Sequence, residues 1–253
     1  MPTWDDAQYL MFANERTRPA RELLRRVPVA APGRVVDLGC GPGNSTELLR
    51  ERWPEARLSG VDSSPEMLER ARRDLPDIEW VQAEADRFVS AEPVDVLFSN
   101  ALLQWIPGHE SLVPALFEQL APGGALAFQV PHNFAEPSHR LMRETAAAYG
   151  ERLARVRATD PVGSPAFYYD LLAPRARSVD VWQTTYEHVM TDASSIVAWV
   201  KGTGLRPFLE ALAEAERPGF LEAYERAIDA AYPRRSDGRR LFSFPRLFVV
   251  AVR

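Results

Sequence analysis

The sequence predicts an α/β fold in which a mostly parallel sheet is covered by helices on both faces. Short apolar runs alternate with helical patterns through the first two-thirds of the 253 residues, and this alternation is typical of parallel strands joined by helical crossovers. The first run passes directly into "DLGCGPG" (37–43), a glycine-rich turn between a strand and a helix. Hydrophobic residues make up 46% and charged residues 26% of the chain, as in ordinary globular proteins.

Five apolar runs are the predicted strands of this part, and three helices are expected between them. The strands cover 34–39, 56–62, 78–85, 94–100 and 124–130, and the helices cover 44–53, 65–74 and 109–120. In the second helix, Ser63 or Ser64 is expected to cap the first turn and Pro65 to occupy it. Leu120 is followed by an alanine and then by proline and two glycines, which favours the end of the third helix there.

The flanking segments are predicted to add helices and two more strands. Residues before the first strand fit one or two helices, with Thr17 as a cap and Pro19 starting the second. Further helices are expected over 137–157, 192–202 and 207–231, strands over 179–190 and 246–252, and a loop over the proline-rich 158–177.

No segment has the composition of a linker, so the sequence predicts a single domain over 1–253. Within it, 1–30 is expected to form an N-terminal helical cap and 34–130 the ligand-binding core. The remainder, 131–253, is expected to complete the sheet and to supply inserted helices as a lid over the substrate.

Charge and composition exclude several classes of protein. A net charge of −5 and a pI near 5.5 argue against a nucleic-acid partner. Cys40 is the single cysteine, so no internal disulfide is possible. No apolar stretch approaches the ~20 residues of a membrane span, and the acidic N-terminus does not resemble a secretory signal. We therefore expect a cytoplasmic protein that requires neither a membrane nor a metal site.

The glycine turn has the features of a ligand-binding backbone. Gly39, Gly41 and Gly43 alternate, and glycines let a ligand approach the main chain and the helix start closely. Asn44, Ser45 or Thr46 is expected to cap the helix. A dinucleotide fingerprint needs a glycine at position 44, and a phosphate loop needs a lysine after the glycines, so neither motif fits.

The motif D-x-G-x-G-x-G resembles motif I of class I S-adenosylmethionine-dependent methyltransferases. This resemblance implies a Rossmann-like fold with a seven-stranded, mostly parallel sheet finished by antiparallel strands. It also implies that S-adenosylmethionine is the cofactor and that Asp37 holds its methionine part, directly or through the loop. Asp62 stands 23 positions after Gly39, near the offset of about 20 expected for an acid that binds ribose hydroxyls. The cofactor-binding residues expected are Asp37, Gly39, Gly41, Gly43, Asn44, Asp62, Ser63, Ala85, Asp86, Asn100 and Ala101, with Ala85 and Asp86 at the adenine.

The methyl acceptor is expected to be a carboxylate. A carboxylate is ionised at neutral pH, so its methylation needs positioning and charge pairing but no general base. Of the four histidines, His132 alone is a credible base, and a loop position is the simpler interpretation. We therefore expect no catalytic side chain. The expected substrate-binding residues are Arg16, Gln104, Trp105, Tyr168, Tyr169, Lys201, Arg206 and Arg246; Trp105 has a core position as its alternative.

Further stretches resemble one bacterial family of carboxyl methyltransferases. They include "YLMFANERTRPARELLRRVP" (9–28), "LLQWIP" (102–107), "WVKGTGLRPFL" (199–209) and "FPRLFVVAVR" (244–253). The resemblance implies that the chain makes the monomethyl ester of a small tricarboxylic acid, with S-adenosylhomocysteine as the other product. Three alternatives stay open: a methyltransferase for another small acceptor, a non-catalytic cofactor-binding regulator and, disfavoured by the glycine spacing, a dinucleotide oxidoreductase.

Overall fold

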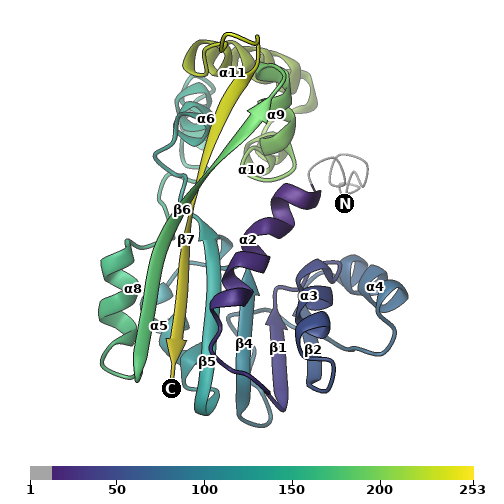
Figure 1. Ribbon diagram of the computed structural model, residues 1–253. Helices are drawn as coiled ribbons and strands as arrows, with labels where there is room; N and C mark the ends of the chain where they lie inside the picture. The colour runs from purple at the N-terminus through teal and green to yellow at the C-terminus, as the bar shows by residue number, and fades with distance from the viewer. Residues whose placement is uncertain (1–12) are drawn as a thin grey trace. The chain divides into compact units, whose positions relative to one another are not determined.

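The computed structural model describes residues 13–253, with side chains from Thr17 onward (Figure 1). The chain divides into two compact units. The sheet unit contains Asn14–Pro131, Pro161–Thr184 and Leu247–Arg253, and the helical unit contains His132–Asp160 and Thr185–Arg246 together with Ala13. The predicted core, 34–130, lies within the sheet unit, whereas residues of the predicted lid segment, 131–253, occur in both units.

In the described residues, seven strands form one sheet in the order β3-β2-β1-β4-β5-β7-β6. The strands β1 (Arg34–Leu38), β2 (Arg57–Asp62), β3 (Glu79–Gln82), β4 (Val94–Asn100) and β5 (Leu120–Pro131) pair in parallel. The last two are β6 (Ser178–Met190) and β7 (Arg240–Val252). The predicted Rossmann-like sheet is confirmed.

The final strand β7 runs antiparallel to both of its neighbours. Residue 253, which follows β7, exchanges backbone hydrogen bonds with Gly123 and Gly124 near the start of β5. The Arg177 N–H, just before β6, donates to the carbonyl of Val252 at the end of β7. The expected antiparallel completion of the sheet is therefore confirmed.

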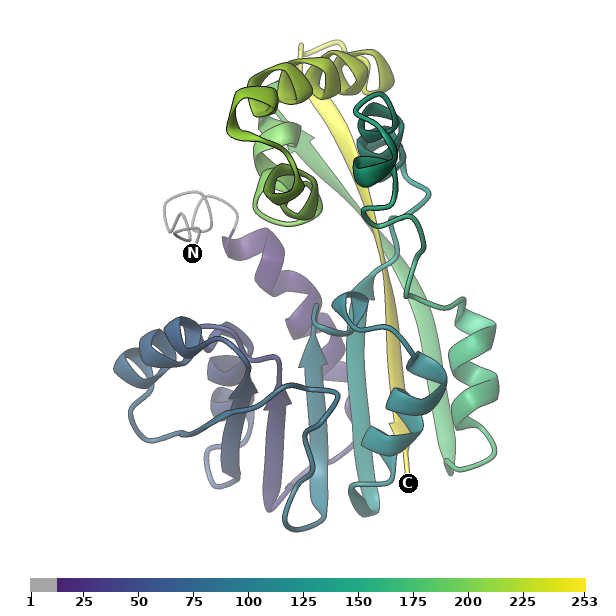
Figure 2. The same cartoon turned by 180° about the vertical axis from the view of Figure 1, so that it is seen from behind.

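Helices cover both faces of the sheet unit, as Figures 1 and 2 show for α2 on one face and α5 on the other. They are α2 (Ala13–Arg26), α3 (Asn44–Arg52), α4 (Pro65–Asp74), α5 (His109–Phe117) and α8 (Pro165–Leu172), with a short 3₁₀ turn η1 (Leu103–Trp105). The face under α5 and α8 is filled by apolar side chains such as Val36, Leu97, Phe117, Phe128 and Leu247. This apolar layer holds the carboxyl ends of β1 and β4 rigidly, because burying it away from water stabilises the fold.

The helical unit has its own apolar core, which includes side chains from the end of β6 and from the start of β7. Its helices are α6 (Pro137–Ala147), α7 (Glu151–Ala154), α9 (Ala193–Lys201), α10 (Arg206–Ala211) and α11 (Arg217–Ala231), with the 3₁₀ turn η2 (Glu214–Glu216). Trp199, Phe208, Phe220, Tyr224 and Phe242 are among the buried side chains that they share. These side chains form a hydrophobic cluster within the unit.

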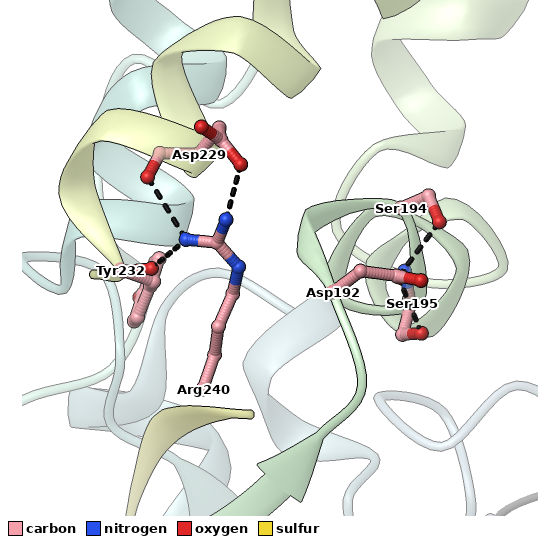
Figure 3. Close-up of polar contacts among 6 residues, drawn as sticks. All are labelled: Asp192, Ser194, Ser195, Asp229, Tyr232 and Arg240. Atoms are coloured by element: carbon pink, nitrogen blue, oxygen red, sulfur yellow. Dashed lines mark hydrogen bonds and ion pairs between the residues drawn. The ribbon is translucent and has the colours of Figure 1, made fainter. Parts of the chain in front are cut away.

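Two polar clusters fix helix ends in this unit (Figure 3). The Arg240 guanidinium is 2% exposed, donates to the carbonyls of Asp229 and Tyr232 at the end of α11, and pairs with the Asp229 carboxylate. Asp192 caps α9 by accepting hydrogen bonds from the Ser195 N–H and from the Ser194 and Ser195 hydroxyls. These donors lower the pKa of Asp192 to about 2.

Several predicted boundaries are wrong. Residues 158–177 contain the helix α8, because Ser164 caps it and Pro165 fits its first turn. Pro19 lies inside one continuous helix α2 and does not start a second helix. The predicted helix 109–120 ends at Phe117, and Leu120 already belongs to β5.

Other segments differ in length or division. The predicted helix 137–157 is divided into α6 and α7, and 207–231 into α10, η2 and α11. The last strand starts at Arg240, six residues before the predicted start at 246. Pro245 lies inside this strand, and its carbonyl accepts the His132 N–H.

Candidate functional site

Asp37 of β1 fixes the start of α3 from below the glycine turn. Its carboxyl is fully buried, and Oδ2 accepts hydrogen bonds from Ser45 Oγ at 2.8 Å and Thr46 Oγ1 at 2.6 Å. The prediction that Asn44, Ser45 or Thr46 caps α3 is therefore wrong. Gly43 occupies the cap position, and the hydroxyls of Ser45 and Thr46 bind Asp37 instead. Burial raises the pKa of Asp37 to about 6, although the two hydroxyl hydrogen bonds act to lower it.

The three glycines of the turn serve different purposes. At Gly39, with φ of +74°, an added Cβ would lie 2.6 Å from Leu102 Cδ2, and at Gly43, with φ of +97°, it would lie 3.3 Å from Leu75 and Trp80. At Gly41, with φ of +54°, an added Cβ would meet no described atom within 4 Å. Packing and backbone conformation therefore require glycine at 39 and 43, whereas Gly41 faces space that a ligand can use.

Asp62 ties the end of β2 to this turn. Its Oδ2 accepts the Gly41 N–H at 2.9 Å, and its Oδ1 accepts the Ser64 N–H at 2.9 Å. The Ser64 hydroxyl in turn caps α4 by accepting the Met67 N–H, which confirms one of the two predicted caps. The carboxylate is half-buried, so it combines a fixed orientation with an accessible position.

Cys40, between these glycines, is 3% exposed. Burial, with the nearby negative charges of Asp37 and Asp62, raises the pKa of its thiol far above the ordinary range. A thiol that stays protonated is a poor nucleophile, so Cys40 acts as a small packed residue.

The segment after β4 is held by a glutamine on the neighbouring strand that the sequence analysis missed. Gln129 Nε2 donates to Asn100 Oδ1, and the Gln129 carbonyl accepts the Ala101 N–H at 3.0 Å. Ala101 has φ of +57°, an unusual conformation for a residue with a side chain. Gln129 was detectable, because a buried amide within the apolar run "GALAFQV" requires a polar partner.

The residues expected to bind the cofactor follow the carboxyl ends of adjacent parallel strands. Asp37 lies in β1 and the glycines 39–43 follow it, Asp62 ends β2 and precedes Ser63, Ala85 and Asp86 follow β3, and Asn100 ends β4 and precedes Ala101. Ala85 is buried, and Asp86, Ser63 and Asn44 are exposed. Because the carboxyl ends of parallel strands lie at one edge of a sheet, this edge is where α/β proteins bind ligands.

Tyr168 does not lie where a ligand could touch it. Its ring is fully buried, and its hydroxyl donates to His109 Nδ1 at 2.6 Å and accepts the Gly163 N–H at 3.2 Å. His109 Nε2 in turn donates to the Leu103 carbonyl at 2.9 Å. The sequence prediction is corrected here: Tyr168 supports the η1 turn through His109 and is not a substrate-binding side chain.

The other predicted substrate residues of the sheet unit differ in accessibility. Trp105 is 46% and Tyr169 52% exposed, so the alternative core position for Trp105 is wrong. Gln104 is 8% exposed. The backbone of Arg16 lies in α2, but its side chain lies outside the described residues.

Lys201, Arg206 and Arg246 belong to the helical unit. Lys201 is exposed in the last turn of α9. Arg206 is also exposed and pairs with Glu210 one turn later at 2.7 Å, and its role as a substrate ligand stays a prediction. Arg246 is 6% exposed, with Cζ 5.0 Å from the centre of the Phe244 ring. Convergence of these residues with those of the sheet unit stays a prediction.

Two of the four histidines, His109 and His139, are buried and held by neighbouring groups. His109 is fixed by two hydrogen bonds. His139 is buried in the helical unit, and burial, with Arg157 and Arg143 nearby, lowers its pKa to about 3. His132 follows β5, and its backbone N–H donates to Pro245. The expectation that no side chain acts as a catalytic base stays a prediction.

The sheet order and the glycine turn define a methyltransferase domain, and residues 35–124 match the family model described as "Methyltransferase domain". The chain is 64% identical to the trans-aconitate 2-methyltransferase of Azoarcus sp. (strain BH72), with 100% of both chains covered. It is 58% identical to that of Paracidovorax citrulli (strain AAC00-1), over 100% of this chain and 99% of the relative. The chain belongs to the trans-aconitate 2-methyltransferase family.

A solved structure also shares the fold. It is Haemonchus contortus phosphoethanolamine N-methyltransferase 2 in complex with phosphomonomethylethanolamine and S-adenosylhomocysteine, with a TM-score of 0.56 and 15% identity. The match covers 93% of this chain and 52% of that chain.

No helix among residues 13–253 is both long and apolar enough to cross a membrane.

Proposed function

We propose that this protein transfers a methyl group from S-adenosylmethionine to one carboxylate of trans-aconitate, giving the monomethyl ester and S-adenosylhomocysteine. The observation that carries the proposal is the 64% identity over the whole length to a trans-aconitate 2-methyltransferase. The partner is then a small polycarboxylate, and a cytoplasmic location stays a prediction.

The residues of the sheet unit fit the cofactor. Gly41 leaves open space beside its Cα, and the loop start is held rigidly by Asp37 and Asp62. Asp62 and Ser63 are proposed to bind the ribose, Ala85 and Asp86 the adenine, and Asn100 and Ala101 the adenosyl group near the sulfur. When bound, S-adenosylmethionine supplies an electrophilic methyl group on a sulfonium sulfur.

Asp37 supports the loop that is proposed to bind the cofactor. Its carboxyl is fully buried beneath the turn, and its hydrogen bonds to Ser45 and Thr46 orient the first N–H groups of α3. Of the two routes left open by the sequence, Oδ2 is used for support of the loop, and Oδ1, which has no hydrogen-bond partner among the described residues, is left for direct contact.

The acceptor site is proposed to work by charge and position alone. The trans-aconitate carboxylates are ionised at neutral pH, so the enzyme has to hold one oxygen in line with the methyl group and exclude water. Trp105 and Tyr169 of the sheet unit, Arg16 of α2 and, from the helical unit, Lys201, Arg206 and Arg246 remain the candidates for this task. Of these, Arg246 is distinguished by its burial, at 6% exposed.

The test is a direct assay of acceptors. The purified protein is incubated with methyl-labelled S-adenosylmethionine and trans-aconitate, cis-aconitate or citrate, and the esters are identified by mass spectrometry. We expect a monomethyl ester with trans-aconitate as the preferred acceptor. Cofactor binding without an ester on any polycarboxylate would instead favour a non-catalytic role or another acceptor.

A further inference from the structure

Gln104 carries a buried hydrogen-bond acceptor that no described residue satisfies. Its Nε2 donates to the Ala101 carbonyl at 2.6 Å. Because a carbonyl oxygen only accepts, the amide nitrogen must face Ala101, and the orientation of the amide is determined. The Gln104 Oε1 atom therefore points the other way, where it is buried and has no hydrogen-bond partner among the described residues.

A buried carbonyl oxygen without a hydrogen bond is unfavourable. Native structures retain such an oxygen where a ligand or another partner donates a hydrogen bond to it. The amide of Gln104 cannot rotate to relieve this, since rotation would place its oxygen against the Ala101 carbonyl. The unsatisfied acceptor is thus built into the segment after β4.

This segment lies directly against the glycine turn. The Leu102 side chain occupies the space that a Cβ at Gly39 would need, and Ser99 Oγ donates to the Leu38 carbonyl at 2.9 Å. Ala101 is held in its left-handed conformation between Gln129 and Gln104. Gln104 is therefore fixed beside the residues proposed to bind the cofactor.

The hydrogen-bond donors of the two ligands indicate which of them Gln104 binds. An acceptor oxygen needs a donor, and the fully ionised tricarboxylate offers only acceptor oxygens. The cofactor has three kinds of donor: the adenine amino group, the ribose hydroxyls and the methionine ammonium. Asp86 and Asp62 are already proposed for the first two.

A second observation favours the ammonium. Asp37 Oδ1 is also buried without a described partner, and Asp37 lies on β1, paired with Phe98 of β4. One unsatisfied acceptor thus lies on β1 and the other in the η1 turn that follows the adjacent strand β4, and the first of them is a carboxylate. A cationic group with three N–H donors complements both.

We infer that Gln104 is a cofactor-binding residue whose Oε1 accepts a hydrogen bond from the methionine ammonium of S-adenosylmethionine. This inference rests on the proposed function and moves Gln104 from the substrate to the cofactor. Hydrogen bonds to charged groups are stronger than neutral ones, so Gln104 discriminates cofactor analogues by their amino group.

The experiment measures binding, not turnover. Isothermal calorimetry gives the dissociation constants of S-adenosylhomocysteine and of its deaminated analogue for the wild type, Gln104→Met and Gln104→Glu. We expect the wild type to prefer the amine by about 10- to 100-fold, Gln104→Met to lose about 10-fold of this preference, and Gln104→Glu to retain or increase it. General damage to the pocket weakens both ligands equally, so the ratio isolates the ammonium contact.

Gln119→Met is the matched control, because both amide atoms of Gln119 already have protein partners, the Phe88 carbonyl and the Ser90 N–H. Its preference for the amine should equal that of the wild type. An unchanged preference in both Gln104 variants overturns the inference, as does a Gln104→Glu variant whose only defect is a raised KM for trans-aconitate. Because S-adenosylhomocysteine binding is measured without an acceptor, failure of the proposed methylation gives a separate result.

Discussion

Replacing Asp37 by asparagine tests the buried carboxylate beneath the glycine turn. The carboxyl is fully buried and its pKa is raised from 3.8 to about 6. A folded-state pKa above the unfolded one means that this group favours the folded state below about pH 3.8. This contribution is lost as the pH rises through about 6. At 1.36 kcal/mol per pKa unit, the loss amounts to about 3 kcal/mol.

Asparagine has no such titration, so the difference in unfolding free energy between Asp37→Asn and the wild type should grow by about 3 kcal/mol in favour of the variant between pH 4 and pH 7.5. Urea denaturation of the ligand-free proteins at several pH values measures this difference. A difference that stays constant across this range would refute the reasoning. Thr46→Val supplies a second arm: it removes a hydrogen bond that lowers the pKa of Asp37, so the pH at which stability is lost should move upward.

Three further predictions follow from the packing. Gly41→Ala should lower the unfolding free energy by about 1 kcal/mol and weaken S-adenosylhomocysteine binding at least tenfold in calorimetry. The control is Gly123→Ala, at a position that is equally open and has φ of +81°. It should lower the unfolding free energy by a similar amount without affecting binding. Arg240→Met should lower the unfolding free energy by about 2 kcal/mol, since it removes charged hydrogen bonds at the end of α11; the exposed Arg226→Met should change it by less than about 0.5 kcal/mol. Cys40 should resist alkylation in the native protein and react at the rate of a free thiol only in denaturant, so rapid native labelling would contradict its burial.

The order of strands and helices in the first half of the chain could be predicted because its signals are local. The strand β4 and the helix α4 have their predicted bounds, and Ser64 forms one of the expected caps. Prediction was poorer from 137 onward, where helices are short and their ends depend on packing. The helix α8 was missed because Pro161, Gly163 and Pro165 suggested a loop, although Ser164 and Pro165 are also a regular helix start.

The candidate site was predictable to the extent that it consists of contiguous residues. Gly41 and Asp62 belong to a short motif and to a strand end, and the spacing alone indicated both. Tyr168 was misinterpreted because the sequence does not specify whether an aromatic ring faces the core or a ligand.

The sequence by itself determined the fold class and the glycine turn, because these depend on hydrophobic periodicity and on the spacing of a few residues. The family and the expected cofactor followed from the resemblance of its motifs to those of known methyltransferases. Tertiary structure alone decided which contacts those residues make. Asp37 binds the hydroxyls of Ser45 and Thr46, and Leu102 fills the space at Gly39. Gln104 retains a carbonyl oxygen without a hydrogen-bond partner among the described residues. These contacts join strands far apart in the chain. Their outcome depends on which side chain fills each space, and no local pattern of residues encodes that.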